Sequence, residues 1–148
     1  MNGFQRIQAA LGGQWPDRTP IMLHNFLMAA AESGVPMSRY RRDPAAIARC
    51  FIESVEKYGY DGIVVDVDTA TLAGAVGVPC VMPDDQPAVC RGRRLRALEE
   101  VRDLGPPAVG DHPGIQAWLE AVRILKRHFG DGIWLRGNCD QCPFSLAA

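Results

Sequence analysis

The sequence lacks a long apolar run, a strong excess of charge and an internal repeat. Its 148 residues are 47% hydrophobic and 22% charged, and the formal net charge is −1. No segment approaches the roughly 20 apolar residues of a membrane helix, and the amphipathic amino terminus lacks the apolar core of a signal peptide. The short basic cluster Arg91-Gly92-Arg93-Arg94 has too few charges to gain much nucleic-acid affinity by counterion release, so it is expected to be a solvated loop. These absences predict a cytoplasmic protein of one domain, residues 1–148, with no membrane partner and no nucleic-acid partner.

The cysteines are too few for a structural zinc site built from two C-x-x-C pairs. Only one such pair, Cys139 and Cys142, is present, and its surroundings are not those of a thioredoxin-like redox motif. In a reducing compartment most cysteines should be free thiols, with Cys50 and Cys80 as small buried residues. Three alternatives stay open for Cys139 and Cys142, namely pocket lining, metal ligation and plain packing.

Amphipathic helices that alternate with short apolar runs predict an α/β fold with a parallel sheet. Strands are expected over 20–24, 61–67 and 131–136, and helices over 3–11, 29–33, 44–58, 69–76, 95–104 and about 113–129. Asp43 is a good N-cap, Pro44 suits the first helical position and Gly59 supplies a left-handed stop. Residues 78–95 are expected to be loop with small strand pieces.

The last helix carries an apolar stripe that is expected to face the core. Its members are Ile115, Trp118, Leu119, Val122, Leu125 and Phe129. His112 and His128, at the two ends of this helix, are expected to be capping or surface residues.

Polar side chains follow each of the three expected strands. His24 and Asn25 follow the first strand, Asp66 and Asp68 the second, and the stretch Asn138-Cys139-Asp140 the third. Chemistry in parallel α/β folds gathers at the carboxyl ends of the strands. The sequence therefore predicts a site where these ends meet.

Four stretches together resemble the N-terminal part of the uroporphyrinogen decarboxylase superfamily. They are MNGFQRIQAALGGQWPDRTPIML, EKYGYDGIVVDVDTATLAGAVGVP, HPGIQAWLEAVRILKRHFGD and GIWLRGNCDQCPFSLAA, in that order. The resemblance implies a TIM (β/α)8 barrel, and the superfamily also contains corrinoid-dependent and methionine-synthase-like methyltransferases. Because such a barrel needs about 250 residues, we expect about three parallel strands of a truncated barrel, incomplete at the C-terminus.

One position matches the decarboxylases and one motif departs from them. Asp68 falls where the decarboxylases keep an aspartate that binds the pyrrole N–H groups of the porphyrinogen. After the first strand they carry Arg-Gln-Ala-Gly-Arg-Tyr, whose arginines bind substrate carboxylates, whereas residues 24–29 read His-Asn-Phe-Leu-Met-Ala here. Without these cationic clamps, the chain fits the methyltransferase branch better. The zinc ligands of that branch belong to the second half of the barrel and are not in this chain.

The resemblance and the strand ends together give the candidate residues. Asp68 is predicted to be catalytic, with capping of the following helix as the alternative. The predicted substrate-binding residues are His24, Asn25, Asn138, Cys139 and Cys142. His24 has the alternative of a satisfied core histidine. His24, Cys139 and Cys142 are also predicted to ligate zinc beside Asp68, where zinc would activate a thiol substrate.

Three functions remain open at this point. The first is methyl transfer to or from a corrinoid carrier protein, the partner that the resemblance implies for the full-length enzyme. The second is decarboxylation of uroporphyrinogen, which needs no cofactor. The third is an inactive fragment, since three parallel strands leave open sheet edges.

Overall fold

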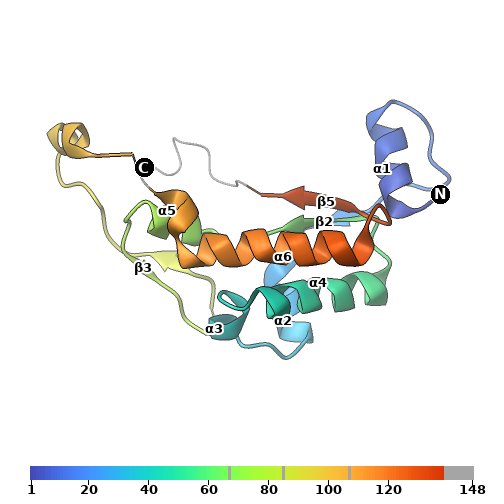
Figure 1. Cartoon of the computed structure of the whole chain (residues 1–148), viewed down its shortest axis with the longest axis horizontal. Helices are drawn as coiled ribbons and strands as arrows, with labels where there is room; N and C mark the ends of the chain where they lie inside the picture. The colour runs from blue at the N-terminus through green and yellow to red at the C-terminus, as the bar shows by residue number, and fades with distance from the viewer. Residues whose placement is uncertain (67, 85, 107, 139–148) are drawn as a thin grey trace.

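The structure is a computed structural model that describes residues 1–66, 68–84, 86–106 and 108–138 (Figure 1). Its α-helices are α1 (Gly3–Leu11), α2 (Phe26–Glu32), α3 (Met37–Tyr40), α4 (Pro44–Tyr58), α5 (Thr71–Ala75) and α6 (Pro113–Phe129). Its strands are β1 (Met22–Leu23), β2 (Gly62–Val65), β3 (Cys80–Val81), β4 (Val89–Cys90) and β5 (Trp134–Gly137), and two 3-10 helices, η1 (Leu98–Asp103) and η2 (Val109–Asp111), precede α6. None of these helices combines the length and the apolar character needed to cross a membrane.

The main sheet has the order β1-β2-β5, and both pairings are parallel. Ile63 in the central strand lies beside Leu23 on one side and Leu135 on the other. The strands are joined through helical segments, as parallel pairing requires. The prediction of a parallel α/β sheet is therefore confirmed. In the expected loop of 78–95, β3 and β4 form a separate antiparallel pair.

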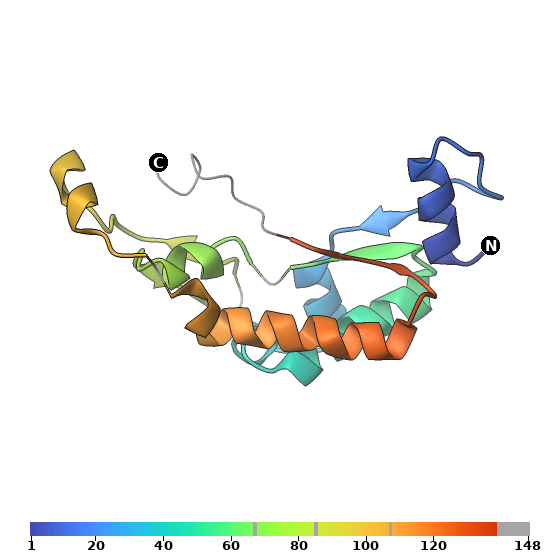
Figure 2. The same ribbon diagram turned by 45° about the horizontal axis from the view of Figure 1, so that its top comes forward.

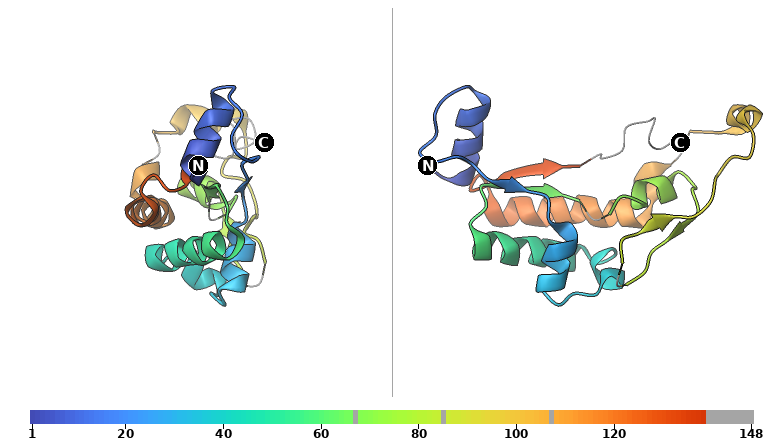
Figure 3. Two further views of the ribbon diagram at one scale, coloured as in Figure 1. Left: turned by 90° about the vertical axis from the view of Figure 1, so that its right-hand side faces the viewer. Right: turned by 180° about the vertical axis from the view of Figure 1, so that it is seen from behind.

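Helices α2, α4 and α6 lie on one face of the sheet (Figure 2). The core between them contains Tyr40, Ile47, Phe51, Ile63 and Leu125, all fully buried. Helix α1 lies instead at the amino-terminal end of the strands, where Phe4 stacks on Trp134 with ring centroids 5.0 Å apart. The other face of the sheet carries no helix in the described part of the chain, apart from α1 at this end (Figures 2 and 3).

Helix α4 forms as its sequence signals predict. The Asp43 carboxylate accepts from the N–H groups of Ala45 and Ala46, at 3.0 and 3.1 Å. Pro44 occupies the first helical position, where its missing N–H costs nothing. Gly59 ends the helix with a φ of 68°, a left-handed conformation that glycine adopts without steric cost.

The predicted apolar stripe of α6 faces the core except at Leu119, with Leu125 buried and Trp118, Val122 and Phe129 packed against the core. The buried residues are Ala117, Ala121 and Leu125, whereas Leu119 is 44% exposed. Residues four apart lie on one helix face, so the alanines form a smooth row in line with Leu125. Their small side chains let α6 approach α4 closely, which larger residues would prevent.

Two elements depart from expectation. The helix predicted over 95–104 is the 3-10 helix η1, which extends away from the rest of the chain (Figures 1 and 3). No side chain caps η1 and none of its residues is buried, and Leu98 is 81% exposed, so no packing favours a full α-helix. Helix α3, which the sequence reading did not find, is a single turn after Pro36 with Met37 and Tyr40 buried.

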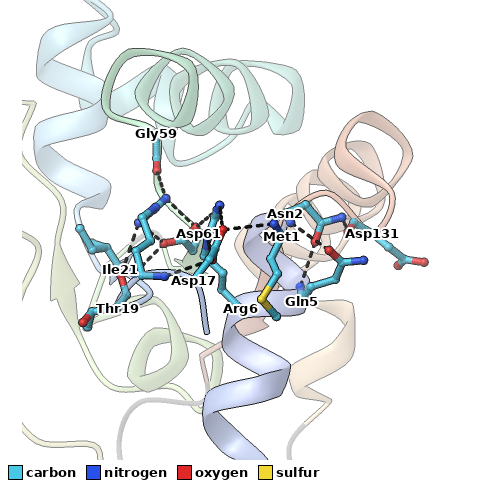
Figure 4. A network of polar contacts seen from close by, with 11 residues as sticks. Met1, Asn2, Gln5, Arg6, Asp17, Thr19, Ile21, Gly59, Asp61 and Asp131 are labelled. Atoms are coloured by element: carbon cyan, nitrogen blue, oxygen red, sulfur yellow. Dashed lines mark hydrogen bonds and ion pairs between the residues drawn. The ribbon is translucent and has the colours of Figure 1, made fainter. Parts of the chain in front are cut away.

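A network of charges at the amino-terminal end of the sheet centres on Asp61 (Figure 4). Asp61 is 1% exposed, and its carboxylate receives Arg6 at 3.0 Å and Arg18 at 2.7 Å. The backbone N–H of Ile21 also donates to it, at 2.9 Å. The buried negative charge is therefore compensated by two guanidinium groups and one peptide group.

Replacing Asp61 with Asn should destabilise the fold by about 2 kcal/mol, because the amide keeps the shape but loses the charge that the arginines pair with. Urea denaturation would measure the change. The matched control is Asp131→Asn, since Asp131 is 76% exposed in its pair with Lys126 and should change stability by less than about 0.5 kcal/mol. Equal effects of the two substitutions would contradict the assignment.

Asp17 gives the network a pH dependence. Arg6 binds both oxygens of Asp17, at 2.6 and 2.9 Å, and this pairing, with the terminal ammonium as a smaller contribution, holds the pKa of Asp17 well below its usual range. A lowered pKa in the folded state means that the contribution is present above about pH 4 and is lost as the pH falls below it. Asp17→Asn should therefore lower the melting temperature at about pH 7 and much less at about pH 3. In an Arg6→Gln background, Asp17→Asn should lower the melting temperature at neutral pH by less. An effect of Asp17→Asn on the melting temperature that grows on acidification would contradict this account.

Candidate active site

Three polar side chains meet at the carboxyl ends of the parallel strands. His24 follows β1, Asp66 follows β2 and Asn138 follows β5. His24 Nε2 lies 3.1 Å from Asp66 Oδ2, and the amide of Asn138 donates to the same oxygen at 2.8 Å. The carboxylate of Asp66 therefore joins the ends of all three strands.

The pleat of the strands explains this convergence. Val65 belongs to the core beneath the sheet, so Asp66, one residue later, faces the opposite side. The register places Val65 beside Gly137, and Asn138 consequently lies on the face of Asp66. The same alternation in β1 brings His24 to this face. Asn138 is therefore level with Asp66, and His24 lies two residues earlier in the register on the same face. We call this group the His24–Asp66–Asn138 cluster.

The cluster presents an imidazole and buries the carboxylate behind it. The side chain of His24 is 39% exposed, whereas that of Asp66 is 1% exposed. A carboxylate oxygen accepts hydrogen bonds, so the contact with Asp66 Oδ2 assigns a hydrogen to Nε2 of His24. A carboxylate that orients a histidine in this way prepares it to accept a proton.

Tyr40 supports the cluster from the core side. Its hydroxyl donates to the backbone carbonyl of Asp66 at 3.4 Å. Burial raises the pKa of Tyr40 well above its usual value, and the nearby Cys50, Asp66 and Asp68 add to this shift. Tyr40 therefore remains a neutral donor at any physiological pH and fixes the backbone at the end of β2.

Asp68, the predicted catalytic residue, is engaged within the protein. It is 4% exposed, and its Oδ1 accepts from the N–H groups of Ala70 and Thr71 at 2.8 and 2.6 Å. Its Oδ2 accepts from the Thr71 hydroxyl at 2.9 Å and lies 3.5 Å from Nε of the buried Arg41. These contacts favour the alternative role, the support of the first turn of α5, and the catalytic role stays a prediction.

The side chain of Asn25 turns away from the cluster. Its amide donates to the hydroxyl of Ser54 in α4 at 2.8 Å. This direction follows from the chain order, because His24 takes the open face and the next residue faces the helices. The structure thus separates Asn25 from His24, and its role in substrate binding stays a prediction.

The predicted zinc ligands cannot be assembled from the described residues alone. Cys139 and Cys142 lie outside them, and within them no group of three or more His, Cys, Asp and Glu side chains could hold a metal ion. His24 is the one predicted ligand that is described, and Asp66 acts as its hydrogen-bond partner. The described residues therefore do not fit a zinc site by themselves.

Sequence reasoning did not select Asp66 or Arg41 as site residues. The sequence signal for Asp66 was the alternation of faces along β2. Val65 enters the core, so Asp66, which follows it and is two residues after Val64, lies on the opposite, open face. Arg41 gave no local signal, because its partners Pro83, Gln86 and Asp68 are far away in the sequence.

The sequence profile described as uroporphyrinogen decarboxylase (URO-D) matches residues 2–148, nearly the whole chain. The chain belongs to the uroporphyrinogen decarboxylase family. The resemblance found in the four sequence stretches is thereby confirmed. No curated protein sequence matches the chain significantly.

The fold of this family member is shared with a solved methyltransferase. A methyltransferase from Methanosarcina mazei superposes with a TM-score of 0.77 at 20% identity, over 93% of this chain and 42% of that one. The chain thus spans less than half the length of that structure. Its three parallel strands and their helices form part of a TIM barrel, as predicted, with the cluster at the carboxyl ends where barrels place their active sites.

The orientation of His24 is open to direct measurement. In the wild-type chain, nitrogen-15 chemical shifts of the His24 ring should show the tautomer with hydrogen on Nε2, because Asp66 accepts from it. Asp66→Asn removes the charge and should give a mixture of tautomers. His112 and His128, which do not contact Asp66, serve as internal controls and should keep their shifts. An unchanged His24 tautomer in the variant would show that Asp66 does not orient the ring.

Proposed function

We propose that this chain supplies the mouth of a methyltransferase site, which moves a methyl group to or from a corrinoid carrier. The observation that carries the proposal is the His24–Asp66–Asn138 cluster, which presents one oriented imidazole where the decarboxylases of the family carry an arginine motif. The fold likeness to a methyltransferase supports the same branch.

The charges near the cluster do not suit a substrate with many carboxylates. Arg41 is 4% exposed and its guanidinium donates to the carbonyls of Pro83 and Gln86. Asp66 adds a buried negative charge directly behind His24. Uroporphyrinogen would need several exposed cationic partners at the mouth, so a small, weakly charged acceptor such as a thiol fits better.

The chain's own residues can prepare such an acceptor. A thiol must lose its proton to become a good nucleophile for methyl transfer. The imidazole of His24 would take this proton, and Asp66 would stabilise the imidazolium that results. Asn138 holds the carboxylate in place through its 2.8 Å hydrogen bond. The corrinoid, when bound, supplies or receives the methyl group.

The test compares two reactions in one set of variants. Methyl transfer from methylcobalamin to a free thiol should lose about 100-fold in kcat/KM in His24→Gln and in Asp66→Asn, the loss expected for a general base. His128→Gln, at the exposed end of α6, is the matched control and should retain full activity.

The same variants test the alternative, decarboxylation of uroporphyrinogen. Release of carbon dioxide from uroporphyrinogen that depends on His24 and Asp66, without methyl transfer, would overturn the proposal in favour of that alternative. A folded chain with neither activity would mean that these residues do not form a working site on their own.

A further inference from the structure

Two cysteines face each other across the β3–β4 pair, outside the His24–Asp66–Asn138 cluster. Cys80 pairs with Cys90 in the antiparallel register, and their Sγ atoms lie 3.4 Å apart. Next to them, the N–H of Arg91 donates to the carbonyl of Pro79 at 2.7 Å. Hydrogen-bonded and non-hydrogen-bonded pairs alternate along such a ladder, so Cys80 and Cys90 form a non-hydrogen-bonded pair. The Cα atoms of such pairs are about 4.5 Å apart, within the range that a disulfide spans.

The two thiols differ in access. Cys90 is exposed and Cys80 is half-buried, and both are free. Cys80 was expected to be a small buried residue, but its side chain points across the ladder and is close to the carbonyl oxygens of Val78 and Ala70, at 3.3 and 3.6 Å. Burial, followed by the neighbouring Cys90, raises the pKa of Cys80 to about 11. A reagent from solution therefore reaches Cys90 first.

We propose that Cys80 and Cys90 form a reversible disulfide by exchange with a small-molecule disulfide such as oxidised glutathione. The Cys90 thiolate attacks one sulfur of the reagent, which forms a mixed disulfide and releases one thiol. Cys80 then loses its proton, attacks Sγ of Cys90 and releases the second thiol. The two cysteines lose two electrons and two protons in total, and the reagent gains them as two thiols.

The disulfide would close the loop that supports Arg41. Between the two cysteines, the carbonyls of Pro83 and Gln86 accept from the Arg41 guanidinium. This guanidinium lies beside Asp68 at the start of α5. Oxidation ties both ends of the loop together and restricts its motion in the folded and unfolded states. The cysteine pair is thus placed to control how firmly Arg41 is held.

Peptide mapping would detect the proposed bond. The chain is equilibrated with mixtures of reduced and oxidised glutathione, blocked with an alkylating reagent and cleaved with trypsin. Residues 58–91 contain no internal Lys or Arg, so both cysteines fall in one peptide. A second cleavage before Asp84 separates the cysteines unless they are linked. From the oxidised chain the two fragments should remain joined through Cys80 and Cys90, with no alkyl group on either sulfur, until a reductant is added, whereas from the reduced chain they should separate with one alkyl group on each cysteine.

Controls separate this pair from the other cysteines. The experiment uses a Cys139→Ser, Cys142→Ser background, so that this C-x-x-C pair cannot contribute. Cys80→Ser and Cys90→Ser should each abolish the link, whereas Cys50→Ser, which removes a thiol buried in α4, should leave it intact. The linked fraction gives the equilibrium constant for forming the Cys80–Cys90 disulfide from glutathione. This constant should be at least about tenfold higher in the native chain than in urea, because the fold holds the sulfurs together.

Two results would overturn the proposal. One is a native chain that carries only a glutathione adduct on Cys90 under the most oxidising mixture. The other is an equal equilibrium constant in the native chain and in urea, which would mean that the β3–β4 pairing does not favour the bond.

Discussion

The buried carboxylate of Asp61 is the constraint on which the rest of the structure depends. Its backbone N–H donates to the carbonyl of Ile21 at 2.8 Å, and its own carbonyl accepts from Trp134 at 2.9 Å. One residue therefore connects the starts of β1, β2 and β5, while its side chain anchors Arg6 of α1. Gly3 lies so close that a Cβ there would be 2.5 Å from the Asp61 carbonyl oxygen, which leaves room for glycine alone. The ion pairs and the tight backbone contact together set the register of the sheet.

Register at one end of the sheet determines chemistry at the other. Because side chains alternate between faces, a shift of one residue in β1 or β5 would send His24 or Asn138 into the helix layer. Asp66 would then be a buried carboxylate without these two partners, which is a costly arrangement. The network around Asp61 therefore helps to position the His24–Asp66–Asn138 cluster, because it fixes the register of the short strands that carry these residues. In a barrel this division is general, since one end of the strands serves stability and the other serves function.

Local signals in the sequence were sufficient for the parts of the fold that local chemistry decides. Asp43, Pro44 and Gly59 bound α4 as predicted, because caps and helix stops act within a few residues. On α6 the apolar stripe was predicted correctly except for Leu119, which is exposed, and hydrophobicity alone did not indicate the buried Ala117 and Ala121. Long-range partners were beyond a local reading, and for this reason the pairing of Cys80 with Cys90 could not be foreseen. The location of a site at the strand ends was predicted, and the alternation along β2 also carried a signal for Asp66 that was not used to select it.

The cost of a buried guanidinium indicates which of Asp66 and Asp68 is available to the site and which is needed to support the fold. Arg41 is 4% exposed, and a buried arginine is tolerated only where carbonyls and a negative charge surround it. Asp68 is that negative charge, and it also binds two N–H groups at the start of α5. If Asp68 bound the N–H groups of a substrate instead, it would leave both the guanidinium and the helix start uncompensated. Asp66 faces no such conflict, because its contacts with His24 and Asn138 lie at the open face itself. The energetics therefore favour Asp68 as the residue that holds the β3–β4 segment and α5 in place, whereas Asp66 is the carboxylate in contact with the imidazole.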